Sequence, residues 1–489
     1  MPTLDALRAK LQPVSQAHVL NFWSTLPQSA RDALTNQIES IDWSAMPRLI
    51  EQYVRNKPVF ELPPKVQPAP YYPVDHTAAF RPWNRAAAKA AGESLLRTGK
   101  VAAFVVAGGQ GSRLGYEGPK GCFPAGAVTG KPLFAMFADA ILGVYDRYGV
   151  HVPWYIMTSP LNHDATLEFF AAHHFFGLPR NSVNLFMQGI MPSLDISTGK
   201  VLMSARGEIA TNPDGHGGSL RALHASGAID DMKQRGVSTI SYFQVDNPTV
   251  NLLDPVFLGL HANAGTAAAA HSSAQMSSKM IPKAYAEEKL GLFCAHGAGE
   301  KQGRTEIVEY SDLPMDMQRE TLPDARLRFL AGSIAVHILG LDFVEKLNTD
   351  AAFELPWHRA EKKIPCVDPA TGEPSKPAAN NGVKLERFVF DALPLCDSSI
   401  VLETDRIEEF APIKNAEGQD SPQSSREIQT ERAARWLEFS GVAVPRRGGA
   451  DGKPDCLLEI SARTASTREE LKAGGKLPRA IERGQRLAM

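Results

Sequence analysis

The sequence is organised around the stretch VAAFVVAGGQGSRLGYEGPKG, residues 101–121. Its first seven residues, Val101–Ala107, are apolar or small, a length typical of a buried strand and too short for a substantial helix. Three glycines and two cations follow this strand: Gly108, Gly109, Gly111, Arg113 and Lys120. Glycine lets backbone N–H groups approach a phosphate closely, and the two cations balance the charge of a polyphosphate. A plain turn needs one or two glycines and no paired cations, so we predict a phosphate-binding loop.

Two common phosphate-binding motifs do not fit this loop. The dinucleotide pattern G-x-G-x-x-G fails because Leu114 stands where the third glycine is required. The P-loop pattern fails because Lys120 is followed by Gly121 and not by Ser or Thr. Residues 108–121 instead match G-G-x-G-[ST]-R-L-G-x(3)-P-K-G at every fixed position, which resembles the signature of sugar-1-phosphate nucleotidyltransferases.

Length and composition set the class of protein. A chain of 489 residues with 43% hydrophobic and 22% charged residues is typical of a globular protein with two or three domains. The net charge of −2 does not favour binding to nucleic acid or to a membrane surface. We expect no membrane span and no signal peptide, and the five scattered cysteines are typical of a cytoplasmic protein with reduced thiols.

The pattern of segments predicts three regions. Residues 1–95 form a helical N-terminal region, 96–405 a catalytic domain and 406–489 a small C-terminal lobe that contains a strand. Strands and helices alternate through the middle region, which predicts an α/β fold, a mostly parallel sheet with helices on both faces.

The predicted elements can be given by their residues. Strands are expected over 101–107, 154–158, 185–188, 239–245 and 456–460, and helices over 86–96, 167–174 and 427–439. A flexible tail is expected after Arg468. Ligands of such sheets bind beyond the carboxyl ends of the strands, where both the glycine loop and Asp246 are expected.

Several further segments resemble one family in the right order. They are Gln188–Pro192, Asn212–Leu223, Val245–Pro248, Asp254–Pro255, Val308–Ser311, Lys362–Pro365, Asn381–Asp391 and Phe410–Asn415. Together they resemble the UDP-sugar pyrophosphorylases, and most closely the eukaryotic-type UDP-N-acetylhexosamine pyrophosphorylases, over roughly residues 100–425. The resemblance implies a Rossmann-like nucleotidyltransferase fold (GT-A-like) with a mixed sheet, and an enzyme that joins UTP to a sugar 1-phosphate.

The resemblance also implies roles for the residues that bind UTP and the metal. UTP would be bound by Gly108, Gly109, Gly111, Gln188 and Gly215, with Gln188 reading the edge of uracil. The catalytic cations would be Arg113, Lys120 and Lys414, of which Lys414 binds the sugar phosphate. Asp246 would bind Mg²⁺. Simpler interpretations stay open: Gln188 could bond a neighbouring backbone group, Asp246 could cap a helix, and Lys414 could be a solvated surface lysine.

The residues implied for the sugar match the family less closely. They are His216, Gly291, Glu309, Ser333, Phe388 and Phe390. Gly291 and Glu309 are retained, whereas His216 and Ser333 each replace an asparagine of the hexosamine enzymes. Phe388 and Phe390 alternate on an expected strand, where core packing and a contact with the N-acetyl group are equally reasonable.

The expected substrate is therefore N-acetylglucosamine 1-phosphate, with glucose 1-phosphate or a broad range of sugars as the alternative. A dehydrogenase lacks support because the dinucleotide pattern is absent, and the retained charges argue against a non-catalytic nucleotide-binding regulator. No oligomeric state follows from the sequence.

Overall fold

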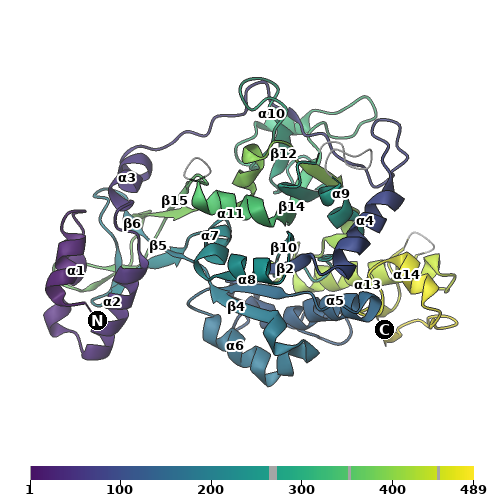
Figure 1. The fold of residues 1–489 in the computed structure, drawn as a ribbon, viewed down its shortest axis with the longest axis horizontal. Helices are drawn as coiled ribbons and strands as arrows, with labels where there is room; N and C mark the ends of the chain where they lie inside the picture. Colours follow the sequence, from purple (N-terminus) through teal and green to yellow (C-terminus); the bar gives the residue numbers. More distant parts are fainter. Residues whose placement is uncertain (1, 264–271, 351–353, 449–451) are drawn as a thin grey trace. The chain divides into compact units, whose positions relative to one another are not determined.

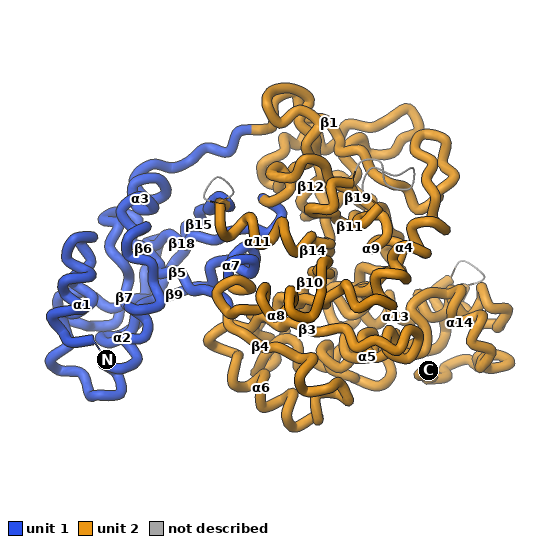
Figure 2. Tube along the Cα trace, viewed as in Figure 1, with its two compact units in different colours: residues 1–61, 188–221, 355–391 blue, residues 62–187, 222–354, 392–489 orange. Residues whose placement is uncertain are grey.

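The computed structural model describes residues 2–263, 272–350, 354–448 and 452–489 (Figure 1). The chain divides into two compact units that interleave along the sequence (Figure 2). Unit 1 comprises residues 1–61, 188–221 and 355–391, and unit 2 comprises residues 62–187, 222–354 and 392–489. The domain boundaries after residues 95 and 405 stay a prediction.

Unit 2 is built on a mixed sheet. One path through it runs in the order β1-β12-β14-β10-β2-β3-β4, and β11, β13 and β19 attach beside this path. The strands are β1 (Gln67–Pro68), β2 (Val101–Val106), β3 (Trp154–Thr158), β4 (Val183–Met187), β10 (Thr239–Gln244), β11 (Met276–Pro282), β12 (Leu292–Ala295), β13 (Thr305–Val308), β14 (Ala331–Gly340) and β19 (Ile400–Glu403). The β10-β2-β3-β4 part is parallel, and β14 joins β10 in the antiparallel direction. The sheet is thus more mixed than the strand–helix alternation alone indicates.

The helices of unit 2 lie between and after these strands. They are α4 (Arg85–Arg97), α5 (Leu133–Tyr148), α6 (His163–Ala172), α8 (Ala228–Gln234), α9 (Pro255–Ala262), α10 (Met315–Arg319), α11 (Leu341–Thr349), α12 (Arg406–Glu409), α13 (Pro422–Phe439) and α14 (Arg468–Ala473). None of the described helices combines the length and the apolar character that crossing a membrane requires.

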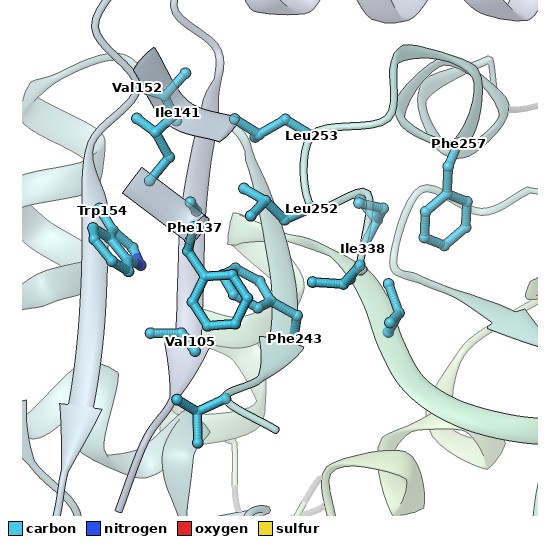
Figure 3. Close-up of a cluster of buried hydrophobic side chains, with 14 of the residues drawn as sticks. Val105, Phe137, Ile141, Val152, Trp154, Phe243, Leu252, Leu253, Phe257 and Ile338 are labelled. Carbon is cyan, nitrogen blue, oxygen red and sulfur yellow. The ribbon is translucent and has the colours of Figure 1, made fainter. Parts of the chain in front are cut away.

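Alternate residues of each strand point to opposite faces of the sheet, and helices pack against both faces. Val105 on β2 and Phe243 on β10 point toward α5, where the rings of Phe137 and Phe243 lie 5.1 Å apart (Figure 3). The other face carries Tyr155 of β3, whose hydroxyl donates to Asp231 of α8 at 2.5 Å. Helices therefore cover both faces, as the fold class requires.

The C-terminal segment is ordered by its own small core. Trp436 and Leu437 of α13 pack with Leu458 and Leu471 in one apolar cluster. Strand β20 (Leu457–Glu459) pairs in parallel with β21 (Arg486–Ala488), the last strand of the chain. The expectation of a flexible tail after Arg468 is wrong, because Leu471 and the β20–β21 pairing tie that segment down.

Unit 1 is assembled from three separate stretches of chain. Its elements are α1 (Leu4–Leu11), α2 (Gln28–Ser40), α3 (Met46–Leu49), β5 (Ile190–Pro192), β6 (Leu194–Asp195), β7 (Met203–Ala205), β8 (Glu208–Ile209), β9 (Thr211–Pro213), β15 (His358–Lys362), β16 (Cys366–Val367), β17 (Pro374–Ser375) and β18 (Gly382–Glu386). Helix α7 (Gly218–Ala225) begins in unit 1 and ends in unit 2. Leu7, Leu34, Leu194 and Leu385 share one apolar core, so helices and strands that are distant in sequence depend on each other.

Candidate active site

The glycine loop and Asp246 lie at the same edge of the sheet. Val106, the last residue of β2, pairs in parallel with Gln244, the last residue of β10. The carboxyl ends of parallel neighbours meet, so the loop after β2 and Asp246 after β10 must come together. Asn162 fixes the start of the loop, because its Nδ2 donates to the carbonyls of Ala107 at 3.0 Å and Gly109 at 3.2 Å.

The glycine loop folds back on itself. The Gly111 N–H donates to the Gly118 carbonyl at 2.9 Å, and the Lys120 N–H donates to the Gly109 carbonyl at 3.0 Å. This closure brings Lys120 back to the first glycines of the loop. Gly121 has to be glycine, because a Cβ there would lie 2.1 Å from the ring of Phe134. Gly109 is exposed and its surroundings are open, as a backbone that receives a phosphate must be.

Asp246 lies between two ammonium groups. Its Oδ2 is 4.0 Å from Lys120 Nζ and 4.0 Å from Lys414 Nζ. The side chains of Lys120 and Asp246 are 15% and 14% exposed, whereas that of Lys414 is 43% exposed. Burial lowers the pKa of Lys120, and the charges of Lys414 and Arg113 lower it further, while Asp246 opposes the change. A site in which cations gather around one carboxylate is prepared for an anion.

Hydrogen bonds between two loops place Lys414. The Ile413 N–H donates to the Asp246 carbonyl at 2.8 Å, and the Lys414 N–H donates to the Asp420 carbonyl at 2.6 Å. Burial raises the pKa of the Asp420 carboxyl, and the charge of Lys414 opposes that rise. Sequence reasoning missed Asp420, because nothing distinguishes an aspartate in a polar, turn-rich segment until the loop is folded.

The helix cap belongs to another residue. Asp254 Oδ1 accepts from the Val256 N–H at 2.9 Å and caps α9. The interpretation of Asp246 as a helix cap is therefore wrong. Lys414 keeps part of its side chain in solvent, but its ammonium lies 4.0 Å from Asp246.

The side chains around Asp246 suit a Mg²⁺ ion that takes most of its ligands from outside the protein. No described residues form a group of three His, Cys, Asp or Glu side chains that could hold a metal alone. Mg²⁺ commonly takes one or two carboxylates and obtains its remaining oxygens from phosphates and water. A single partly buried carboxylate beside a phosphate loop fits a metal that is bound together with a nucleotide.

Three of the residues implied for the sugar meet in unit 2. Gly291 directly precedes β12, and the first residue of that strand, Leu292, pairs with Val308 of β13 and Gly332 of β14. The next residues along those two strands, Glu309 and Ser333, therefore lie close to Gly291. The Ser333 N–H donates to the Gly291 carbonyl at 2.8 Å. A Cβ on residue 291 would lie 3.3 Å from Glu309 Oε1, so glycine keeps the space beside this carboxylate free.

Gln188 and the second glycine loop belong to unit 1. Gln188 directly follows β4 and is 7% exposed. The next residue, Gly189, accepts from the Asp214 N–H at 3.3 Å, which ties this segment to the loop 214–218. Burial raises the pKa of Asp214 to about 6, although Arg387 lies nearby.

The loop 214–218 packs closely on the backbone that follows β18. Gly215 has a φ of +86°, and a Cβ there would lie 2.3 Å from the Arg387 carbonyl oxygen. The Gly217 N–H donates to that same oxygen at 2.8 Å. Both the close approach and the backbone conformation therefore require glycine at position 215.

His216 forms an aromatic group with the two phenylalanines. Its ring lies 5.1 Å from that of Phe388 and 5.5 Å from that of Phe390, and these two are 5.1 Å apart. The expectation that both phenylalanines lie on a strand is wrong: β18 ends at Glu386 and a short helical segment, Val389–Leu395, begins instead. Residues 386–388 pack tightly against the loop 214–218, and the chain turns at this contact.

His216 is held neutral with a defined tautomer. Burial lowers its pKa to about 4, and the charge of His358 adds to this effect. The Val389 N–H donates to Nδ1 at 3.2 Å, so Nε2 carries the proton and is the donor. Sequence reasoning identified the residue but not His358, whose ring stacks on Phe388 at 4.2 Å.

Comparison with known proteins gives a consistent result. The family described as UTP–glucose-1-phosphate uridylyltransferase matches residues 49–421. UDP-N-acetylglucosamine diphosphorylase 2 of Arabidopsis thaliana is 34% identical over 89% of this chain and 85% of its own length. The human UDP-N-acetylhexosamine pyrophosphorylase-like protein 1 is 33% identical over 96% of this chain and 95% of its own length.

A solved structure agrees at the level of the fold. The UDP-N-acetylglucosamine pyrophosphorylase of Trypanosoma brucei, solved with an inhibitor, covers 98% of each chain with a TM-score of 0.79 and 23% identity. The nucleotidyltransferase signature, the cations around Asp246 and these matches lead to one conclusion: the chain belongs to the UTP–glucose-1-phosphate uridylyltransferase family.

Proposed function

We propose that this protein transfers the uridylyl group of UTP to N-acetylglucosamine 1-phosphate, forming UDP-N-acetylglucosamine and pyrophosphate. The observation that carries the proposal is the position of Asp246 between Lys120 and Lys414 beside the glycine loop. The choice of sugar is supported by the name of the plant relative, which specifies N-acetylglucosamine, and the human relative's name specifies an N-acetylhexosamine.

The chemistry requires little acid–base work from the protein. A phosphate oxygen of the sugar substrate is ionised at neutral pH and attacks the α-phosphorus of UTP in line, while the bond to pyrophosphate breaks. The residues must bring two anions together and stabilise the charge that develops between them. Lys120 and Arg113 would bind the UTP phosphates, and Lys414 would bind the phosphate of the sugar. Gln188 would select uracil, and Glu309 and His216 would contact the sugar.

Asp246 would hold Mg²⁺, which when bound supplies positive charge to the phosphate oxygens. Asp246→Asn should shift the Mg²⁺ dependence of turnover to higher concentration, because an amide oxygen is a weaker ligand for a hard cation. An unchanged Mg²⁺ curve would contradict this assignment. The five cysteines are all free, which supports the further proposal that the protein is cytoplasmic.

The test is release of pyrophosphate from UTP with a panel of sugar 1-phosphates, with ATP and CTP as nucleotide controls. The proposal expects N-acetylglucosamine 1-phosphate to give the highest kcat/KM and UTP to be preferred strongly. Glucose 1-phosphate is the second candidate, since His216 and Ser333 replace two asparagines of the hexosamine enzymes. A higher kcat/KM for glucose 1-phosphate would replace the proposed substrate, and no pyrophosphate with any sugar would refute the proposal.

A further inference from the structure

A buried ion cluster lies behind the loops that carry Asp246 and Lys414. Lys279 of β11 has a side chain that is 0% exposed. Its Nζ lies 2.8 Å from Asp254 Oδ2 and 2.7 Å from each carboxylate oxygen of Glu409. Burial lowers the pKa of Lys279, but the charges of Asp254 and Glu409 outweigh that effect and raise it. Lys279 is therefore charged and bonded to both carboxylates at once.

Each carboxylate of the cluster is fixed by a further contact. Asp254 uses its other oxygen to cap α9 through the Val256 N–H. Glu409 Oε1 accepts from the Thr404 hydroxyl at 2.8 Å. A buried ion group keeps a single geometry only when its remaining hydrogen-bonding capacity is satisfied in this way.

Each carboxylate lies at one end of a segment whose other end is a residue of the site. Asp254 ends the segment 246–254, which begins with Asp246, and Glu409 begins the segment 409–414, which ends with Lys414. Asn247 joins the segments, because its Nδ2 donates to the Glu409 carbonyl at 2.6 Å and its Oδ1 accepts from the Ala411 N–H at 3.1 Å. The bond from the Ile413 N–H to the Asp246 carbonyl completes the connection.

We propose that Lys279 is a positioning residue of the active site: it holds the segments 246–254 and 409–414 at one separation and so fixes Lys414 relative to Asp246. This inference rests on the proposed function for its kinetic consequences. A misplacement of about 1 Å in a reacting geometry costs roughly 100-fold in rate. A residue that never touches substrate can therefore control turnover through this separation.

The test separates positioning from charge balance. Lys279→Met leaves two buried carboxylates without a cation, so loss of stability is expected together with a fall in kcat. The triple variant Lys279→Met, Asp254→Asn, Glu409→Gln removes all three charges, and neutral replacements of buried ion groups are often tolerated. We expect the triple variant to regain most of the lost stability, while its kcat stays about 10- to 100-fold below that of the wild type. Recovery of kcat together with stability would overturn the inference.

Glu409→Gln replaces one carboxylate oxygen by an amide group and leaves the other oxygen as an acceptor for Lys279. Its kcat should fall by about three- to tenfold, as expected for one weakened charged contact. Wild-type kcat in Glu409→Gln would overturn the inference even if Lys279→Met does not fold.

Leu471→Ala is the matched control, because Leu471 is 3% exposed in the apolar cluster of the C-terminal segment. All variants are assayed well below their own Tm, and kcat is referred to folded protein. Leu471→Ala should lower the Tm and leave kcat unchanged. Equal losses of kcat in Leu471→Ala and Lys279→Met would reduce Lys279 to a stabilising residue.

Hydrogen exchange gives a readout that does not depend on activity. The amide of Ile413 should exchange faster in Lys279→Met and in the triple variant, and at the wild-type rate in Leu471→Ala. If the wild-type protein releases no pyrophosphate but Ile413 shows this pattern, the proposed function fails and the positioning role stands. If the wild type is active and neither kcat nor exchange changes in the variants, the positioning role fails alone.

Discussion

At the scale of single residues, the two cations of the glycine loop, Lys120 and Arg113, differ in their exposure to solvent. Lys120 is mostly buried and faces Asp246. Arg113 is exposed, lies in the short helical turn Ser112–Leu114, and is close enough to Lys120 for its charge to lower the pKa of that ammonium. The two cations therefore differ in how much of their interaction is screened by water.

Lys120→Ala should lower kcat/KM by about 100- to 1,000-fold, the cost of removing one preorganised group that stabilises transition-state charge. Arg113→Ala should give a smaller loss, because an exposed cation is screened. Neither change should lower the Tm by more than a few degrees. Steady-state kinetics and a thermal melt check both statements. Near-normal activity in both variants would remove the phosphate loop from the proposed mechanism.

His216 should make stability depend on pH. Its folded-state pKa of about 4 is below the ordinary value of 6.5, so between these values the unfolded chain takes up a proton that the folded chain does not. Stability is therefore lost as the pH falls from 6.5 toward 4, by up to about 3 kcal/mol. His216→Asn should lose less stability than the wild type between pH 7 and 4.5, measured by denaturant unfolding. Parallel curves would show that His216 is protonated as readily in the folded state as in the unfolded state.

His216 and Ser333 should also set the preference for the sugar. A serine hydroxyl is shorter than an asparagine carboxamide and makes fewer hydrogen bonds, so one contact to the sugar is lost or passes through water. Wild-type discrimination against glucose 1-phosphate should be weaker by about two- to tenfold than in the double variant His216→Asn, Ser333→Asn. The measurement is the ratio of kcat/KM for the two sugar phosphates. An unchanged ratio would assign selection to other residues.

At the scale of helices and strands, close backbone contacts decide which glycines are essential. Helices α4 and α9 approach each other through Gly92 and Gly259. A Cβ on Gly92 would lie 1.8 Å from the Pro255 carbonyl oxygen, and one on Gly259 would lie 1.7 Å from that of Ala88. Since Asp254 caps α9, the same contact supports the ion cluster around Lys279.

Gly92→Ala should destabilise the protein although alanine favours helices. The helix preference contributes about 0.5–1 kcal/mol, whereas forcing a methyl group against a backbone oxygen costs about 1–3 kcal/mol or more. Gly474→Ala is the control, because a Cβ there would meet nothing closer than 3.4 Å. Thermal melts should show a lower Tm for Gly92→Ala only. Equal Tm values would mean that α4 shifts at no cost.

The sequence predicts those elements best whose burial is uniform. Strands β2, β3 and β10 agree with the predicted ranges within one residue at each end, because runs such as Val101–Ala107 are apolar or small throughout and favour burial on both faces. The turn at Phe388 was missed because it is caused by the glycine loop 214–218, more than 160 residues earlier. That the loop carrying Lys120 lies near Asp246 follows from the parallel strands that precede them. The approach of Lys414 to Asp246 could be expected only from the family resemblance, since a contact between distant loops leaves no local pattern.

At the scale of the whole molecule, each of the two units is formed by stretches that are separated along the sequence by parts of the other unit. Unit 1 takes residues 1–61, then 188–221 and finally 355–391, and its core includes side chains from all three stretches. The contacts between these stretches can form only after the last stretch has been made.

Removal of residues 1–61 should therefore damage more than the helices that are removed. The shortened chain would expose Met191, Leu194, Val383 and Leu385, which are buried in the wild type. We expect lower solubility and a lower Tm, measured by sedimentation and thermal melting. A separate peptide of residues 1–61 added in trans should restore part of the solubility. A shortened chain with wild-type solubility and Tm would show that the remaining stretches form a core alone.

This interleaving has a consequence for the protein while it is still on the ribosome. Leu7 and Leu34 emerge early, yet Val383 and Leu385, which share their core, are added more than 300 residues later. At about 5–20 residues per second, the early helices wait roughly 15–70 seconds for these partners. During that time their apolar faces are available to other nascent chains, so the yield of the protein in a cell should depend on the speed of translation and on the supply of chaperones.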